Sequence, residues 1–328
     1  MLAVVEITPW HWVGFIVCVL IFLALDLGVF HRHAHTVKFK EALVWSVVWF
    51  TLAMLFALGL TPLRGKQEAL QFVTGYLIEL SLSMDNVFVI ALLFTYFNIP
   101  REHQHRVLYW GILGALIMRG LMIGLGIALI TLVDWVLYIF GAFLLYSGFR
   151  MLFVQSEVHP ENNRVVRWVR KLYPVTPDIH GQRFMIRWEG RRALTPLALV
   201  LVMVETTDLL FAVDSIPAVF AVTRKPFIVF TSNVFAILGL RSLYFLLADA
   251  IGYFRYLKYG LPAVLVFMGV EMLLDSHDRL PPLWFQVDIP TSVSLLVVAG
   301  ILLISIVLSV IAARHDKKQK GQNPSKAV

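Results

Sequence analysis

The stretch ALQFVTGYLIELSLSMDNVFVIALLF, residues 69–94, decides the fold of this chain. It is long enough for a helix that crosses a bilayer, which needs roughly 20 mainly apolar residues. Its only charged side chains are Glu79 and Asp85. Because one charge at the centre of a membrane helix costs about 2.5–3.5 kcal/mol on the translocon scale, two acids in one span are a functional signal. The stretch therefore predicts a transmembrane helix with a buried polar centre.

The rest of the chain has the composition of a membrane protein. Of the 328 residues, 59% are hydrophobic and 15% are charged, whereas soluble domains have about 45–50% and 25%. Predicted spans lie at residues 9–30, 42–60, 69–94, 107–132, 135–153, 194–222, 227–250, 257–274 and 291–313. We therefore expect an all-α, polytopic membrane protein with about nine transmembrane helices.

The Lys and Arg residues predict the orientation of the chain. Of these 28 residues, 21 lie in segments that share one side of the membrane, 5 lie on the other side and 2 lie inside spans. Segments rich in Lys and Arg stay in the cytoplasm, so we predict the N-terminus outside and the C-terminus in the cytoplasm. Topology then explains the net charge of +7, and we expect no nucleic-acid partner.

Polar segments divide the chain into six parts. These are the first two spans (1–68), a three-helix unit (69–154), a cytoplasmic connector (155–193), a second three-helix unit (194–275), the ninth span (276–313) and a basic tail (314–328). In the connector, residues 164–172 predict an amphipathic helix on the inner leaflet, and residues 184–190 predict a β-hairpin.

The two three-helix units resemble each other. The residues that align are Glu79 with Asp208, Asp85 with Asp214, Asn86 with Ser215, Arg119 with Arg241, and Gly148 with Gly269. Because three spans are an odd number, the two copies enter the membrane in opposite directions. This predicts an inverted repeat of the third to fifth and sixth to eighth spans, the arrangement of many secondary transporters, whose sites lie near the midplane between the repeats.

The predicted spans contain more acidic than basic side chains. The acids are Asp26, Glu79, Asp85, Glu205, Asp208 and Asp214, and the bases are Arg119 and Arg241. The formal balance is −4, so either some acids are protonated or a cation lies among them. The alternative, in which the acids only pair with the arginines and hold helices together, leaves four negative charges without a partner.

Helix geometry limits which of these residues can meet. Residues six apart differ by about 240° around the axis, so Glu79 and Asp85 do not share a face of an undistorted helix. We expect Asp85 with Asn86 to meet Asp214 with Ser215 across the pseudo-two-fold axis, with Glu79 and Asp208 in flanking layers. Glu205 and Asp208 share a face. Pro217 and the polar runs 81–83 and 206–207 predict local breaks whose free carbonyls bind an ion.

The candidate ligands are all oxygens, which favours hard cations such as Mn²⁺, Mg²⁺ or Ca²⁺ over Zn²⁺ or Cu⁺. The metal-site candidates are Asp85, Asn86, Asp214, Ser215, Glu79, Asp208, Glu205 and Asp26. Arg119 and Arg241 are either permanent ion-pair partners or tethered cations that occupy the acidic site after the metal leaves.

Three groups near the span ends allow other readings. Asp26 is either a further ligand or a helix-end residue beside Arg32. The histidines of the run 31–35 either bind metal, sense pH or form a solvated basic flank. Glu271 and Asp249 are expected near cytoplasmic ends of their spans, in contact with water.

A motif that the sequence lacks bears on the energy source of transport. The chain has no phosphate-binding loop of the Gly-x-x-x-x-Gly-Lys-Ser/Thr type, so we expect neither ATP hydrolysis nor an enzyme. Moving a divalent cation out against an inside-negative potential costs about 4.6 kcal/mol per 100 mV. Exchange of the metal ion for protons on the carboxylates is the simplest way to supply this energy. We expect the metal to be the substrate, and we expect no permanently bound cofactor.

Four motifs, at residues 25–32, 83–89, 211–218 and 231–241, resemble the TerC family of membrane proteins and its Alx-like branch. The resemblance implies a multi-pass protein of the bacterial inner membrane, grouped with the LysE-type transporters, with manganese export as its role. It implies that Asp85, Asn86, Asp214 and Ser215 are metal-site residues, with Glu79, Glu205 and Asp208 beside them.

The same family is associated with tellurium resistance and redox modulation. The single cysteine, Cys18, and the missing cofactor motif favour indirect origins for both. An alternative function is a non-transporting membrane partner that helps to insert or metallate other proteins, in which case the connector 155–193 carries the function.

Overall fold

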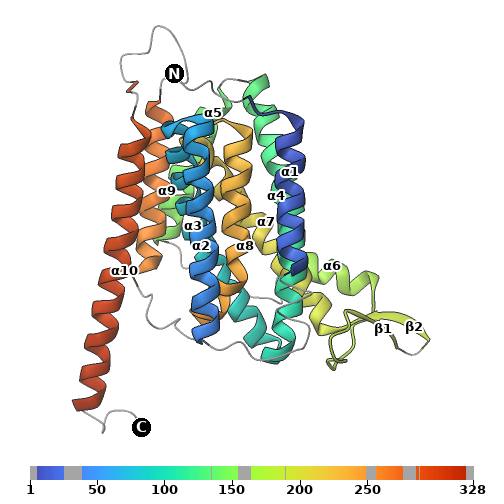
Figure 1. Cartoon of the computed structure of the whole chain (residues 1–328). Coiled ribbons are helices and arrows are strands. Elements are labelled where there is room, and N and C mark those ends of the chain that lie inside the picture. Colours follow the sequence, from blue (N-terminus) through green and yellow to red (C-terminus); the bar gives the residue numbers. More distant parts are fainter. Residues whose placement is uncertain are drawn as a thin grey trace.

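The computed structural model describes residues 6–25, 39–133, 135–153, 164–188, 190–248, 256–275, 286–287 and 289–322. Its helices are α1 (Pro9–Leu25), α2 (Phe39–Arg64), α3 (Lys66–Tyr96), α4 (Arg101–Leu132), α5 (Val136–Phe153), α6 (Arg164–Leu172), α7 (Pro196–Val222), α8 (Pro226–Ala248), α9 (Leu257–Leu274) and α10 (Thr291–Gln322). Strands β1 (Met185–Trp188) and β2 (Arg191–Leu194) form an antiparallel hairpin. The long helices stand side by side in one bundle (Figure 1).

The all-α polytopic membrane fold is confirmed. Seven helices of the described chain, α2 to α5, α7, α8 and residues 291–312 of α10, are long and apolar enough to cross a membrane. Residues 9–24 and 259–274 form shorter apolar helices at two further predicted spans. The total of nine spans therefore stays a prediction.

Buried residues concentrate on three helices. Most side chains of α8 are inside the protein, and α3 and α7 carry long runs of buried residues. The outer helices α2 and α5 bury only a few positions. This burial places the acidic stretches of α3 and α7 at the centre of the bundle.

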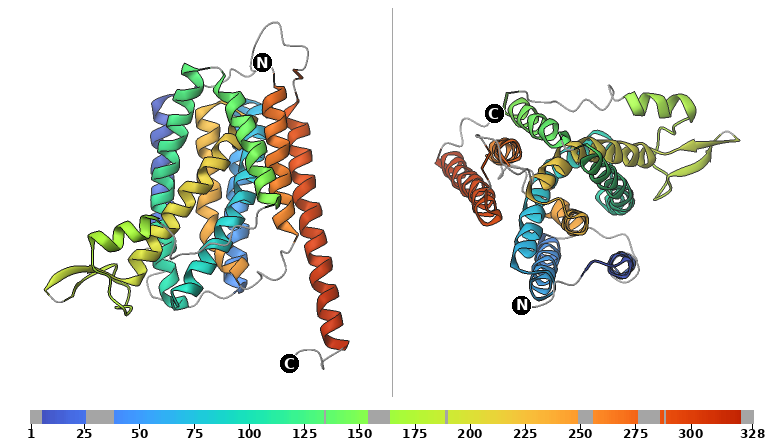
Figure 2. Two further views of the ribbon diagram at one scale, coloured as in Figure 1. Left: turned by 180° about the vertical axis from the view of Figure 1, so that it is seen from behind. Right: turned by 90° about the horizontal axis from the view of Figure 1, so that it is seen from above.

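The predicted amphipathic helix and hairpin of the connector are both present, as α6 and as β1 with β2. They project sideways from one end of the bundle, which we call the connector end (Figures 1 and 2).

The predicted helix breaks are wrong. Both α3 and α7 run without interruption through the polar runs and through Pro217. Ser81 and Thr207 donate their hydroxyl hydrogens to carbonyls four residues earlier, those of Leu77 (2.6 Å) and Met203 (2.7 Å). Because these hydroxyls are satisfied within their own helix, they do not pull the backbone open.

Helices α5 and α9 pack closely at Gly148 and Gly269, the two glycines that align between the three-helix units. A Cβ atom at Gly269 would lie 2.9 Å from the carbonyl oxygen of Gly141 and 2.9 Å from the nitrogen of Leu145. A Cβ atom at Gly148 would lie 3.0 Å from the carbonyl oxygen of Pro262. The contacts are reciprocal and antiparallel, as an inverted repeat predicts.

Replacing Gly269 with Ala is therefore expected to destabilise the protein by about 1–3 kcal/mol, because the added methyl group meets backbone atoms that cannot move away cheaply. The matched control is Gly124→Ala in α4, where a Cβ atom would meet nothing within 4 Å. The midpoint of SDS-induced unfolding in mixed micelles measures the difference. Equal midpoints for the two variants would show that the α5–α9 crossing adapts easily.

Candidate functional site

The centre of the bundle joins α3 to α7 through two matching hydrogen bonds. Asn86 Nδ2 donates to Asp208 Oδ1 at 2.9 Å, and Ser215 Oγ donates to Glu79 Oε1 at 3.2 Å. In each helix the two residues are seven apart, which brings them to the same face after two turns. Each amide or hydroxyl therefore reaches the first acid of the other helix, and the two helices run antiparallel through the contact.

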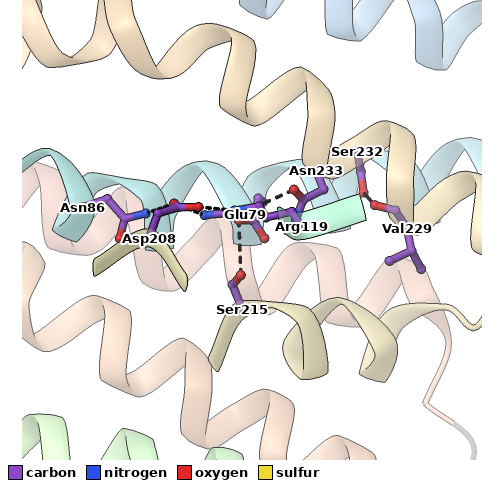
Figure 3. A network of polar contacts seen from close by, with 8 residues as sticks. All are labelled: Glu79, Asn86, Arg119, Asp208, Ser215, Val229, Ser232 and Asn233. Atoms are coloured by element: carbon purple, nitrogen blue, oxygen red, sulfur yellow. Dashed lines mark hydrogen bonds and ion pairs between the residues drawn. The ribbon is translucent and has the colours of Figure 1, made fainter. Parts of the chain in front are cut away.

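Arg119 of α4 links the two acids. Its Nε and Nη2 atoms donate to Asp208 Oδ2 (3.1 Å) and Oδ1 (2.8 Å) in a bidentate contact. Its Nη1 atom forms an ion pair with Glu79 and lies 3.5 Å from Asn233 Oδ1 of α8. Figure 3 shows these side chains close together, and they belong to α3, α4, α7 and α8. Both Arg119 and Glu79 are fully buried, so this ion pair is shielded from water.

The arrangement corrects the expected layers. Asn86 bonds to Asp208 and Ser215 to Glu79, instead of one central layer of four residues with Glu79 and Asp208 outside it. Asp214 accepts a hydrogen bond from Ser147 Oγ of α5 at 2.6 Å. The reason is the helix period, because residues seven apart share a face and residues six apart do not.

Several buried oxygens of the described residues lack a hydrogen-bond donor. Near the centre they are Glu79 Oε2, Asp85 Oδ2, Asn86 Oδ1 and Glu205 Oε2. Buried polar atoms in folded proteins nearly always have a partner, so each exception requires an explanation. All four atoms are acceptors, so a water molecule, a proton or a cation would satisfy them.

The centre of the bundle carries more acidic than basic side chains. Its five carboxylates are Glu79, Asp85, Glu205, Asp208 and Asp214, and the guanidinium groups beside them are Arg119, Arg241 and Arg150, whose charge acts on Asp214. The formal balance of these groups is −2. In the described part of the chain, no group of three or more His, Cys, Asp or Glu side chains is arranged to hold a metal ion. Arg119 occupies the space between Glu79 and Asp208.

A small cavity of about 20 Å³ lies beside this network. Asn86, Thr207, Asp208 and Arg241 give it a polar wall, and its volume suffices for one water molecule. Arg241 is therefore close to the predicted site, although Arg119 is the arginine that bridges the two acids. The roles of both arginines stay predictions.

The connector end holds a second cavity of about 470 Å³ between α3, α4 and α8. One layer of side chains separates it from the small cavity. In this layer Tyr244 Oη donates to Gln104 Oε1 at 3.0 Å, and the rings of Tyr244 and Phe94 meet edge to face at 5.5 Å. Each of these residues lies one helical turn from a residue that lines the small cavity, namely Leu240, Leu108 or Ile90.

The opposite end of the bundle is closed by ion pairs. The buried carboxylate of Glu68 on α3 accepts hydrogen bonds from Arg64 Nε of α2 (2.7 Å) and from Lys225 Nζ at the start of α8 (2.7 Å). Thr223 at the end of α7 donates to Gln71 Oε1 of α3 at 3.0 Å. These contacts tie four helices together at this end.

The remaining predicted residues are placed as follows. Glu205 lies one turn before Asp208 and packs against Gly114 of α4. Asp26, Asp249 and the histidines of the run 31–35 lie outside the described residues.

Sequence reasoning missed three polar residues and misjudged a fourth. Asn233 and Ser147 contact the network or its acids, and Ser294 donates to Glu271. Glu271 was expected in water but is buried, and its Oε2 atom lacks a donor. The signal for Asn233 was its place in the polar run 231–233, whereas Ser147 and Ser294 resemble any other serine in a span.

The chain is similar to known proteins over nearly its whole length. Residues 64–317 match the model of the integral membrane protein TerC family. The membrane protein STKORF319 of Myxococcus xanthus is 51% identical over 319 residues, which cover 97% of each chain. A proposed membrane-bound redox modulator, Alx, of Escherichia coli K12 is 46% identical over 325 residues, covering 96% of this chain and 98% of the relative. No solved structure matches the chain.

Proposed function

The chain belongs to the TerC family of integral membrane proteins, and from this premise we propose that it transports a divalent metal cation, Mn²⁺ first of all, in exchange for protons. The observation that carries the proposal is the excess of buried acceptors at the centre. Four oxygens without a donor and a formal balance of −2 are the surroundings that suit a hard, oxygen-binding cation.

In this proposal, Arg119 holds the place of the cation. Its guanidinium group neutralises Glu79 and Asp208, which would otherwise be two buried negative charges at great cost. A divalent cation that enters takes over this role and draws in Asn86 Oδ1 and Asp85 as further oxygen ligands. When the cation leaves, Arg119 returns and protons satisfy the remaining acids.

The cavity at the connector end and the ion pairs at the opposite end suit a state of the transport cycle that takes up the cation from the connector side. We propose that the connector end faces the cytoplasm, so that the 470 Å³ cavity admits the cation from inside. The layer of Tyr244, Gln104 and Phe94 then opens to reach the centre, and release requires the Glu68 ion pairs at the opposite end to separate. Net export in the bacterial inner membrane is part of the same proposal.

The name of the Escherichia coli relative points to redox modulation. This chain has one cysteine, Cys18, which is exposed on α1. One thiol cannot form an internal disulfide. We therefore propose that any redox effect of this protein is indirect and follows from the metal content of the cell.

The test is Mn²⁺ flux into liposomes that contain the purified chain and a trapped fluorescent reporter, with an imposed pH gradient. The wild type is expected to transport, and Asp85→Asn and Asp208→Asn to fall at least tenfold, because each loses one charge of the cation site. Lys66→Gln, which changes an exposed residue away from the centre, is the control and is expected to keep its flux.

The flux measurement distinguishes a transporter from a non-transporting membrane partner. If folded wild-type protein moves no more Mn²⁺ than empty liposomes, the transport proposal fails. The connector would then be the segment to test for a partner-protein function, by replacing residues 164–194 and following cellular metal tolerance. Flux that does not respond to the pH gradient would overturn proton exchange alone.

A further inference from the structure

Helix α6 and the hairpin form a lateral arm, residues 164–194, whose purpose the transport site does not explain. In Figures 1 and 2 the arm projects sideways from the bundle near the connector end, across the direction of the long helices. In a protein that spans the membrane, an element in this position lies against the surface of one leaflet. The arm is thus placed to meet lipid.

Hydrogen bonds fix the arm to the bundle. Thr195, at the start of α7, donates its hydroxyl hydrogen to the carbonyl of Arg183 (2.7 Å) and its backbone N–H to that of Phe184 (3.0 Å). The guanidinium of Arg106 on α4 lies 5.2 Å from the centre of the Phe184 ring. The arm therefore presents its outer side chains in a defined orientation.

Helix α6 has an apolar face that the bundle covers only in part. Val166 packs into the core, whereas Trp168 and Leu172 are 63% and 54% exposed. At 100° per residue, Trp168 and Leu172 share one edge, and the exposed Arg167 and Arg170 lie on the other side. This is the pattern of a helix in the membrane interface, with aromatic and leucine side chains toward the acyl chains and basic ones among the headgroups.

The arm is also strongly basic. Residues 164–194 include eight Lys or Arg and two Asp or Glu, and seven of the basic side chains are exposed. Lys and Arg close to a membrane surface attract anionic lipids, with a contribution of about fivefold in binding for each residue. The charge of the arm is therefore complementary to an anionic leaflet.

A recess of about 620 Å³ lies where the arm meets the end of α3. Tyr96, Phe97 and Asn98 form one wall, and Arg170 contributes a cationic side chain from α6. The volume lies in the range of ligand pockets, about 300–1,000 Å³. Asn98 also lines the 470 Å³ cavity, so the two spaces are neighbours at the end of α3.

We infer that the lateral arm binds anionic phospholipids, with Trp168 and Leu172 among the acyl chains, the exposed basic side chains at the phosphates and one headgroup in the recess beside Arg170. The site is independent of the transported ion. By binding these lipids, the arm concentrates anionic phospholipid around the connector end of the protein.

The test uses the full chain in phosphatidylcholine liposomes with 30% phosphatidylglycerol (a chosen composition). Brominated acyl chains, which quench tryptophan fluorescence, are carried either by the anionic lipid or by part of the zwitterionic lipid, at the same mole fraction of the total lipid in both cases. The contribution of Trp168 is the difference between the wild type and Trp168→Phe. We expect stronger quenching, by about twofold or more, when the anionic lipid carries the bromine, because the basic side chains enrich it locally.

Two variants test whether the lipid preference depends on the positive charge of the arm. Arg170→Gln is expected to bring the quenching by the two brominated lipids closer together, whereas Lys66→Gln, at the opposite end of α3, is expected to leave their difference unchanged. Salt at 0.5 M should weaken the preference in the wild type. Equal quenching by both brominated lipids would overturn the headgroup selectivity. Absence of quenching would place Trp168 outside the bilayer and favour a soluble acidic partner.

Discussion

Replacing Arg119 with Met is expected to lower the free energy of unfolding by about 3–5 kcal/mol, the cost of removing one partner from a buried ion pair. Arg119 is 2% exposed, and it is bonded to Asp208 through two nitrogens and paired with Glu79. Met keeps the length of the side chain and removes the charge. SDS-induced unfolding in mixed micelles, followed by tryptophan fluorescence, measures the loss.

Two further variants test the electrostatic origin of this loss. Arg119→Lys keeps the charge but cannot make the bidentate contact with Asp208, so its stability should lie between those of the wild type and Arg119→Met. Adding Glu79→Gln and Asp208→Asn to Arg119→Met removes the charges that were left behind and should recover much of the stability. If Arg119→Met were as stable as the wild type, the two acids would already be neutral and the ion pairs would not hold the helices together.

Mn²⁺ is expected to restore stability to Arg119→Met. If Arg119 holds the place of a cation, its removal leaves Glu79 and Asp208 open to a metal ion. A ligand that binds only the folded state stabilises it by about 2.7 kcal/mol at 100 times its dissociation constant. Repeating the unfolding titration over a range of Mn²⁺ concentrations should therefore show a rise in the midpoint that saturates.

The matched control is Arg119→Met combined with Asp208→Asn, which lacks one of the two acids that Arg119 neutralises and should gain little from Mn²⁺. The wild type should gain less than Arg119→Met, because its own guanidinium competes for the site. Equal gains in all three proteins would mean that Mn²⁺ binds elsewhere. No gain in any of them would contradict the idea that Arg119 and the metal share one position.

Much of the fold follows from local sequence. Apolar runs such as residues 69–94 can satisfy their backbone in a bilayer only as helices, and each predicted span overlaps a helix of the described chain. The connector also followed from local pattern, because the alternation of basic and apolar residues at 164–172 has the helical period. The inverted repeat stays a prediction, although the reciprocal contacts of α3 with α7 and of α5 with α9 agree with it.

The candidate site was only partly predictable. The sequence shows that Glu79, Asp208 and Arg119 lie in spans and that such residues must find partners there. It does not show that Asn86 bonds to Asp208 or that Ser147 bonds to Asp214. The predicted breaks failed for a similar reason, because a serine or threonine in a span can bond to its own helix as readily as to an ion.

The sequence by itself therefore determined that the chain is a bundle of membrane helices and that its centre carries an excess of acids, because both follow from the cost of burying charge and backbone in a bilayer. The tertiary structure decided which of these acids share a partner. Those contacts depend on how each helix is rotated and where it crosses its neighbours, and close packing at sites such as Gly269 and Gly148 sets both.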